Sequence, residues 1–176
     1  MSKKNNSQDN NLKKKVISTK VILLFLSIIV IASLITRIYF LNFEIPITHD
    51  ALNYFFYALD IKNSNQLPIN YSLANPGWGI FLSVFFSNFE SQNIIDYMNL
   101  QKILSISISS LTVLPMYLLS KKFFSKSYSL LGALIIGFEP HLIQNSLSGI
   151  SDSLYIFLIA ISFVLYFNEN KKIKYI

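Results

Sequence analysis

A long apolar run near the amino end constrains this chain more than any other feature. The run covers residues 16–41, and its centre from Val21 to Ile35 holds no charged residue. About 20 apolar residues suffice for a helix to cross a bilayer, so we interpret the run as a transmembrane helix. The alternative is a secretory signal peptide, because lysines precede the run, but its length and the lack of a small-x-small cleavage site argue against that. Arg37, near the outer end, is expected to extend to the interface.

The whole chain has the composition of a membrane protein. It is 52% hydrophobic and only 14% charged, which is too apolar for an ordinary soluble domain. Residues 100–120, 128–143 and 150–167 are further apolar stretches. Residues 77–89 make a shorter one, below the roughly 17 residues that a spanning helix needs. The chain contains no cysteine, which excludes disulfides and thiolate metal sites.

The distribution of charge selects a topology. With four spans and residues 77–89 lying in the interface, 12 of the 15 basic residues fall inside and 7 of the 9 acidic residues fall outside. Basic residues concentrate in cytoplasmic loops of membrane proteins, so both termini are expected in the cytoplasm. The net charge of +6 is then an orientation signal, and nucleic acid is not an expected partner.

We therefore predict an all-α integral membrane fold of the cell membrane, with four transmembrane helices and interfacial helices in a large first outer loop. The expected order is a disordered cytoplasmic tail (1–15), helix 16–41, an outer loop (42–99) with helices at 49–62 and 77–89, helix 100–120, a basic cytoplasmic turn (121–127), helix 128–143, an outer turn (144–149), helix 150–167 and a cytoplasmic tail (168–176).

The outer loop carries the first group of candidate functional residues. Thr48 can cap a helix whose first turn contains Asp50, where the helix dipole favours a carboxylate. At helical spacing, Asp50, Tyr54 and Tyr57 share one face, which is expected at the outer membrane surface. A loop of this length is usually functional or disordered, and its aromatic and aliphatic content argues against disorder.

Two further acids, Glu139 and Asp152, lie near the outer ends of predicted spans. Carboxylates at membrane depth are costly and are by default candidates for a functional role. Asp152 has an alternative explanation, because Ser151 and Asp152 can cap the last helix.

The order of these segments resembles the amino-terminal part of the GT-C superfamily, which comprises integral-membrane glycosyltransferases that use polyprenyl-phosphate sugars. "HDALNYFFYA" is similar to their first-loop motif, with Ala51 in place of a common Glu. "NPGWGIFLSVFF" is similar to their interfacial segment, with Asn75 in place of a common His. "SKKFFSKSYSLLGALIIGFEPHLIQNSLSGISDSLYIFL" is similar to their next two spans. The groups resembled are the protein O-mannosyltransferases, the aminoarabinose transferases and the RgtA/B/C/D-like proteins.

The resemblance implies an enzyme that transfers a hexose or pentose from a polyprenyl-phosphate donor to an acceptor at the outer face, with inversion. Asp50 would be the catalytic base. The expected substrate-binding residues are His49, Tyr54, Arg37, Lys102, Glu139 and Asp152, of which Arg37 and Lys102 would hold phosphate. Family members typically have eight or more spans, so the chain is expected to be a fragment or to pair with a second chain that supplies the missing spans.

Other interpretations stay open. Asp50, His49 and Glu139 could bind a divalent metal, as oligosaccharyl-transferring members do, but the mannosyl-transferring members need none, and we expect no cofactor. The main alternative function is a non-catalytic polytopic subunit or scaffold derived from the same fold. A transporter is the third interpretation, although no pair of broken helices recurs in matching halves of the chain.

Overall fold

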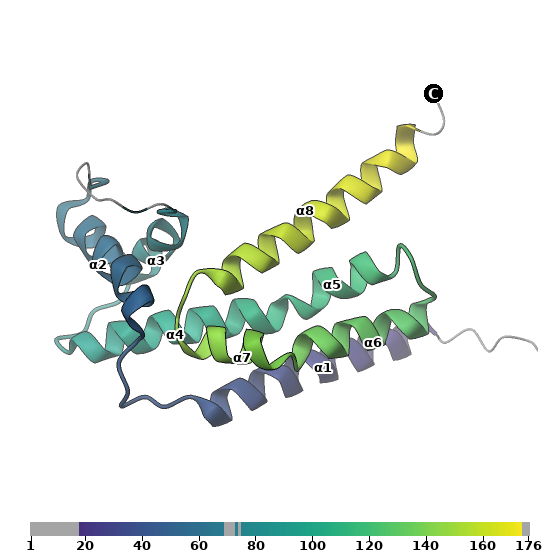
Figure 1. The fold of residues 1–176 in the computed structure, drawn as a ribbon, viewed down its shortest axis with the longest axis horizontal. Helices are drawn as coiled ribbons and strands as arrows, with labels where there is room; N and C mark the ends of the chain where they lie inside the picture. Colours follow the sequence, from purple (N-terminus) through teal and green to yellow (C-terminus); the bar gives the residue numbers. More distant parts are fainter. Residues whose placement is uncertain (1–17, 69–72, 74, 174–176) are drawn as a thin grey trace, which may run out of the picture.

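The computed structural model describes residues 18–68, 73 and 75–173, and the expected tail at 1–15 lies outside them. The described chain is all helical (Figure 1). Its helices are α1 (Thr19–Phe40), α2 (His49–Ser64), α3 (Gly77–Ser87), α4 (Ile94–Leu111), α5 (Val113–Ser120), α6 (Lys126–Gly137), α7 (Pro140–Leu147) and α8 (Asp152–Ile173).

Two helical stretches in the described ranges are long and apolar enough to cross a membrane, Thr19–Phe40 and Ile94–Ser120. The predicted all-α membrane fold is thereby confirmed. The second stretch comprises α4 and α5, which meet at Thr112. Pro115 explains this break, because it has no N–H to donate to the carbonyl four residues earlier.

The long helices form a bundle in which α1 packs against α4, α5 and α6, and α8 crosses α4 and α5 at an angle (Figure 1). One apolar cluster joins α1, α5 and α6. It consists of Ile22, Leu26, Ile29, Val113, Tyr117 and Ala133. Gly137 lets the end of α6 approach the beginning of α5 closely, because a Cβ at Gly137 would lie 3.2 Å from Val113 Cγ2. Small residues permit such close approach between membrane helices.

The stretch predicted as one span at 128–143 is interrupted. Helix α6 ends at Gly137, and α7 begins at Pro140, where the missing N–H of proline costs nothing. The 12 residues of α6 rise about 18 Å, whereas the hydrocarbon core of a bilayer is about 30 Å thick. Helix α6 alone is therefore shorter than the hydrocarbon core. The predicted outer turn at 144–149 is correspondingly replaced in large part by α7, which runs to Leu147.

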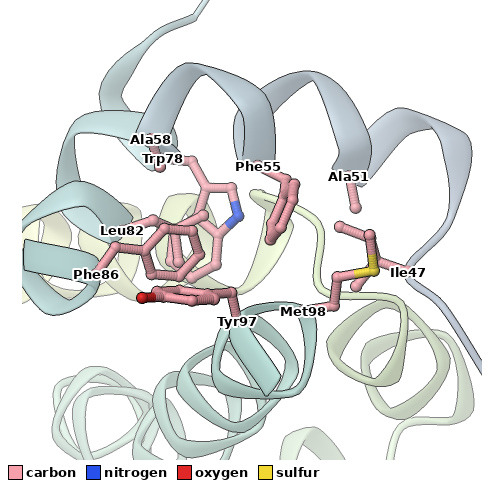
Figure 2. Close-up of a cluster of buried hydrophobic side chains, with 9 residues drawn as sticks. All are labelled: Ile47, Ala51, Phe55, Ala58, Trp78, Leu82, Phe86, Tyr97 and Met98. Atoms are coloured by element: carbon pink, nitrogen blue, oxygen red, sulfur yellow. The ribbon is translucent and has the colours of Figure 1, made fainter. Parts of the chain in front are cut away.

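A second apolar cluster joins α2 and α3 to the beginning of α4 (Figure 2). Its buried members are Ile47, Ala51, Phe55, Ala58, Trp78, Leu82, Phe86, Tyr97 and Met98. A Cβ at Gly79 would lie 2.7 Å from Tyr57 Cδ1, so the glycine allows α2 and α3 to touch. Tyr57 is only 6% exposed, and the expectation that it faces the outer surface beside Asp50 is wrong, because α3 covers that side of α2.

Candidate functional site

The turn between α7 and α8, residues 148–151, is where the separate parts of the structure meet. We call it the junction turn. Gly149 adopts φ +74°, a backbone conformation that favours glycine. Its carbonyl oxygen accepts hydrogen bonds from Trp78 Nε1 at 3.1 Å and from Gln101 Nε2 at 2.8 Å. Helices α3 and α4 therefore both hold the same peptide group of this turn.

Helix α2 reaches the junction turn with one face. Thr48 Oγ1 donates to the Ser148 carbonyl at 3.5 Å, and Ser151 Oγ lies 3.5 Å from the Tyr54 hydroxyl. Between these two, the Ala51 carbonyl accepts from Gln101 Nε2 at 3.2 Å. Positions 48, 51 and 54 are three residues apart, which places them on one side of the helix. The amino end of α2 is thus fixed against the turn that leads into α8.

Next to the junction turn lies an open pocket of about 620 Å³, which we call the α3–α8 pocket. One wall comes from the beginning of α3 and the other from the beginning of α8. The lining residues are Asn75, Pro76, Gly77, Trp78, Ser151, Asp152, Leu154, Tyr155 and Leu158. Asp152 supplies its carboxylate, and Oδ2 accepts from Asn145 Nδ2 at 2.8 Å. The pocket therefore offers apolar walls beside one oriented acid, which suits a ligand with an apolar part and a polar head.

Asp50 and His49 lie in the first turn of α2, and both are exposed. Asp50 accepts no hydrogen bond from the part of the chain that the structure describes. A solvent-facing carboxylate without a partner is able to accept a proton from a bound molecule. Tyr54, one turn further along, connects this end of α2 to the junction turn through Ser151.

Arg37 is buried within the bundle and does not extend to the interface, so that expectation is wrong. Its exposed fraction is 0%. Nη1 donates to the Ser33 Oγ, to the Ser33 carbonyl at 3.2 Å and to the Gly137 carbonyl at 2.8 Å, and Nη2 donates to Ser109 Oγ at 3.0 Å. The Gly137 carbonyl is free to accept because α6 ends there. These internal acceptors replace water, and they hold Arg37 away from the pocket.

Lys102 is also occupied within the protein. It is 2% exposed, and its ammonium group donates to the Asn42 carbonyl at 2.9 Å, to the Ile45 carbonyl and to Asn99 Oδ1 at 3.5 Å. All three donors of a lysine are thereby used. Lys102 ties the connection between α1 and α2 to α4, and it faces neither Asp50 nor the α3–α8 pocket.

Glu139 acts as the N-cap of α7. Its Oε2 accepts from the Leu142 N–H at 2.6 Å, which satisfies an amide that the helix itself leaves unpaired. The structure therefore brings together Tyr54, Ser151 and Asp152, with Asp50 at the same end of α2, and gives Arg37, Lys102 and Glu139 other partners. Within the described ranges, no three His, Asp or Glu side chains converge. Asp50, His49 and Glu139 do not form a metal-binding set there.

Sequence reasoning did not identify Gln101, Trp78 or Gly149. A tryptophan in a short apolar stretch at the membrane surface is typical of an interfacial aromatic residue, yet Trp78 is 2% exposed. Gln101 offered a usable signal, because a polar side chain inside an apolar helix needs a partner. Gly149 follows a serine-rich stretch that predicts a turn.

Comparison with known proteins identifies the family. A family model described as oligosaccharyl transferase STT3, N-terminal, matches residues 68–168. The matched range includes α3 to α7, much of α8 and the whole α3–α8 pocket, whereas Asp50 precedes it. No curated protein and no solved structure shows a significant match. Because the family model covers more than half of the 176 residues, the chain belongs to the oligosaccharyl transferase STT3 N-terminal family, within the GT-C superfamily of glycosyltransferases.

Proposed function

We propose that this chain takes part in transferring a glycan from a polyprenyl-phosphate donor to an acceptor at the outer face of the cell membrane. The observation that carries the proposal is that one junction turn is tied to α2 next to the exposed Asp50 and leads directly into Ser151 and Asp152, which line the α3–α8 pocket. The family is one of oligosaccharyl transferases, so the donor is a lipid-linked sugar or oligosaccharide. The helices that line the pocket, α3 and the beginning of α8, lie toward the end of the molecule where α1 ends and α4 begins (Figure 1), which suits a donor held in the bilayer.

In this proposal the pocket binds the donor. Leu154, Tyr155 and Leu158 supply apolar surface for the part of the donor next to the lipid chain. The phosphate lies at the beginning of α3, which has no acidic residue in its first turn and whose N-cap, Pro76, has no side chain able to accept from the first amides. A helix amino terminus of this kind favours an anion. The beginning of α3, and not Arg37 or Lys102, binds the phosphate in this proposal, because the donors of those two side chains are engaged inside the protein.

Asp50 acts as the base. The nucleophilic atom of the acceptor forms a bond to the anomeric carbon while the bond from that carbon to the phosphate oxygen breaks. The phosphate leaves with the electron pair, and the proton of the acceptor passes to an Asp50 carboxylate oxygen. A single displacement of this kind inverts the anomeric centre. Asp152, held by Asn145, orients hydroxyl groups of the sugar, and Tyr54 and His49 border the path of the acceptor.

The test uses the full chain in proteoliposomes, supplied separately with a radiolabelled sugar on polyprenyl phosphate and on polyprenyl diphosphate. Transfer is measured as label that leaves the lipid-extractable phase. Asp50→Asn should lower the rate by about 10²- to 10⁴-fold, which is the usual contribution of a general base. Asp60→Asn is the matched control, since Asp60 is an exposed acid on the same helix.

Two outcomes would contradict the proposal. Full transfer by an Asp50→Asn protein that inserts normally would remove the base assignment. An unaltered protein that transfers label from neither donor, while remaining folded, would instead favour a non-catalytic subunit of the same family.

A further inference from the structure

We propose that Gln101 is a positioning residue that fixes the Asp50 end of α2 relative to the Asp152 end of α8. The inference rests on the proposed function, in which Asp50 is the base and Asp152 lines the donor pocket. Gln101 touches neither side chain in the structure. It donates to the carbonyl of Ala51, the residue directly after Asp50, and to the carbonyl of Gly149 in the junction turn that precedes Asp152.

The two hydrogen bonds define the orientation of the Gln101 amide. Nε2 donates to the Ala51 carbonyl at 3.2 Å and to the Gly149 carbonyl at 2.8 Å. Both partners are acceptors only, so the nitrogen must face them, and a rotated amide would place its oxygen against two carbonyl oxygens. Gln101 is 0% exposed, so water does not compete for these positions. The side chain therefore acts as a bracket of fixed geometry between α2 and the junction turn.

The backbone of the junction turn leaves room for the Gln101 side chain. Gly149 has φ +74°, and a Cβ there would lie 3.3 Å from Gln101 Cγ and 3.4 Å from Ile47 Cγ2. Trp78 Nε1 donates to the same carbonyl as Gln101, and two donors use both lone pairs of the oxygen. One peptide group thus joins α3, α4 and, through Gln101, α2. The Gly149 carbonyl therefore helps to position both the α3 wall of the pocket and the part of α2 that carries Asp50.

Positioning explains Gln101 better than stability alone does. Its Oε1 is buried and accepts no hydrogen bond from the described residues, a penalty that an apolar side chain at this site would avoid. The two carbonyls also keep other partners without Gln101. The Gly149 carbonyl still accepts from Trp78, and the Ala51 carbonyl lies inside α2, where the amide four residues on donates to it. Gln101→Met, which keeps the length of the side chain and removes the amide, is therefore expected to fold.

The first measurement reads the geometry directly and needs no activity. The chain contains no cysteine, so spin labels attach only to cysteines introduced at Asn53 on α2 and Ser162 on α8, both exposed. Pulsed electron paramagnetic resonance on the full chain in nanodiscs should give one narrow distance distribution. Gln101→Met should broaden or shift it, because α2 loses its buried link to the junction turn through Ala51 and keeps only the two longer contacts, each at 3.5 Å, of Thr48 and Tyr54. An unchanged distribution would overturn the proposal.

Lys62→Met is the matched control for this measurement. Lys62 bonds to the Phe89 carbonyl and to the Tyr97 hydroxyl, so it fastens the opposite end of α2. Its replacement also removes a partly buried polar contact of α2 but leaves the junction turn intact. The distribution should stay narrow in this variant, and broadening equal to that of Gln101→Met would show general loosening and overturn a specific role for Gln101.

The second measurement is kinetic and uses the labelled polyprenyl donors named above. Gln101→Met should lower kcat by about 10- to 100-fold, since a misplacement of about 1 Å can cost 10²-fold, while the KM for the donor changes less. In an Asp50→Asn background the same substitution should cause no further loss, because residues that act as a unit are not additive. Additive losses would overturn the route through Asp50. If the unaltered chain transfers no sugar, the proposed function fails, and the spin-label result still decides the positioning role.

Discussion

Arg37 carries a positive charge at a position that no water reaches. Every hydrogen-bond acceptor found around it is neutral: the Ser33 hydroxyl and carbonyl, the Gly137 carbonyl and the Ser109 hydroxyl. Its Nε has no partner in the described ranges. Burying this charge carries a large desolvation cost. The hydrogen bonds that Arg37 donates must offset that cost, and hydrogen bonds to a charged group contribute more than neutral ones. Arg37 thereby links α1, α4 and the end of α6 at one point.

This arrangement makes Ser109→Ala a sensitive substitution. It leaves Arg37 Nη2 without its 3.0 Å partner, and the free energy of unfolding should fall by about 1–3 kcal/mol. The measurement is reversible unfolding in mixed detergent micelles, followed by circular dichroism. Ser107→Ala is the control, because Ser107 donates only within α4, to the Ile103 carbonyl, and should change stability by less than about 0.5 kcal/mol. Equal effects of the two substitutions would contradict the role given to Ser109.

At the scale of the elements, local sequence signals predict where helices form better than how they pack. The predicted helix at 49–62 and α2 at His49–Ser64 begin at the same residue, since the N-cap position at Thr48 and the unbroken pattern after it are local features. The interruption of 128–143 was missed although Pro140 is visible in the sequence, because the apolar pattern continues across it. The interior partners of Arg37, Lys102 and Gln101 depend on acceptors contributed by other helices, and periodicity along one helix does not contain that information.

The cap of α7 allows a prediction that separates structure from chemistry. Glu139 accepts from the Leu142 N–H at 2.6 Å, and Glu139→Ala should lower the free energy of unfolding by about 1 kcal/mol, the usual effect of losing a cap. Glu139→Gln retains an acceptor oxygen and should recover most of this stability. Because the contact found for Glu139 is structural, Glu139→Gln should also leave sugar transfer within about twofold of the unaltered protein. A large loss of transfer in a stable Glu139→Gln protein would restore Glu139 to the candidate site.

At the scale of the whole molecule, charge and architecture agree on an orientation. The connection between α5 and α6 carries Lys121 and Lys122 and lies at the same end of the bundle as the beginning of α1 (Figure 1). Helices α2 and α3 and the beginning of α4 lie at the other end. The two ends are joined by α1 and by Ile94–Ser120, the two stretches long enough to span a bilayer. We therefore propose that the lysine end is cytoplasmic and that the candidate site is outside.

Cysteine labelling tests this orientation in intact cells, because the unaltered chain has no thiol. Gln92→Cys lies in the exposed connection between α3 and α4, and Phe124→Cys lies in the connection between α5 and α6, where Phe124 is 62% exposed. A membrane-impermeant maleimide should label Gln92→Cys from outside and should label Phe124→Cys only after the membrane is opened, since basic connections are retained in the cytoplasm. Labelling of Phe124→Cys in intact cells, with Gln92→Cys protected, would invert the topology. Asp50 and the α3–α8 pocket would then face the cytoplasm, and an acceptor at the outer surface could not reach them.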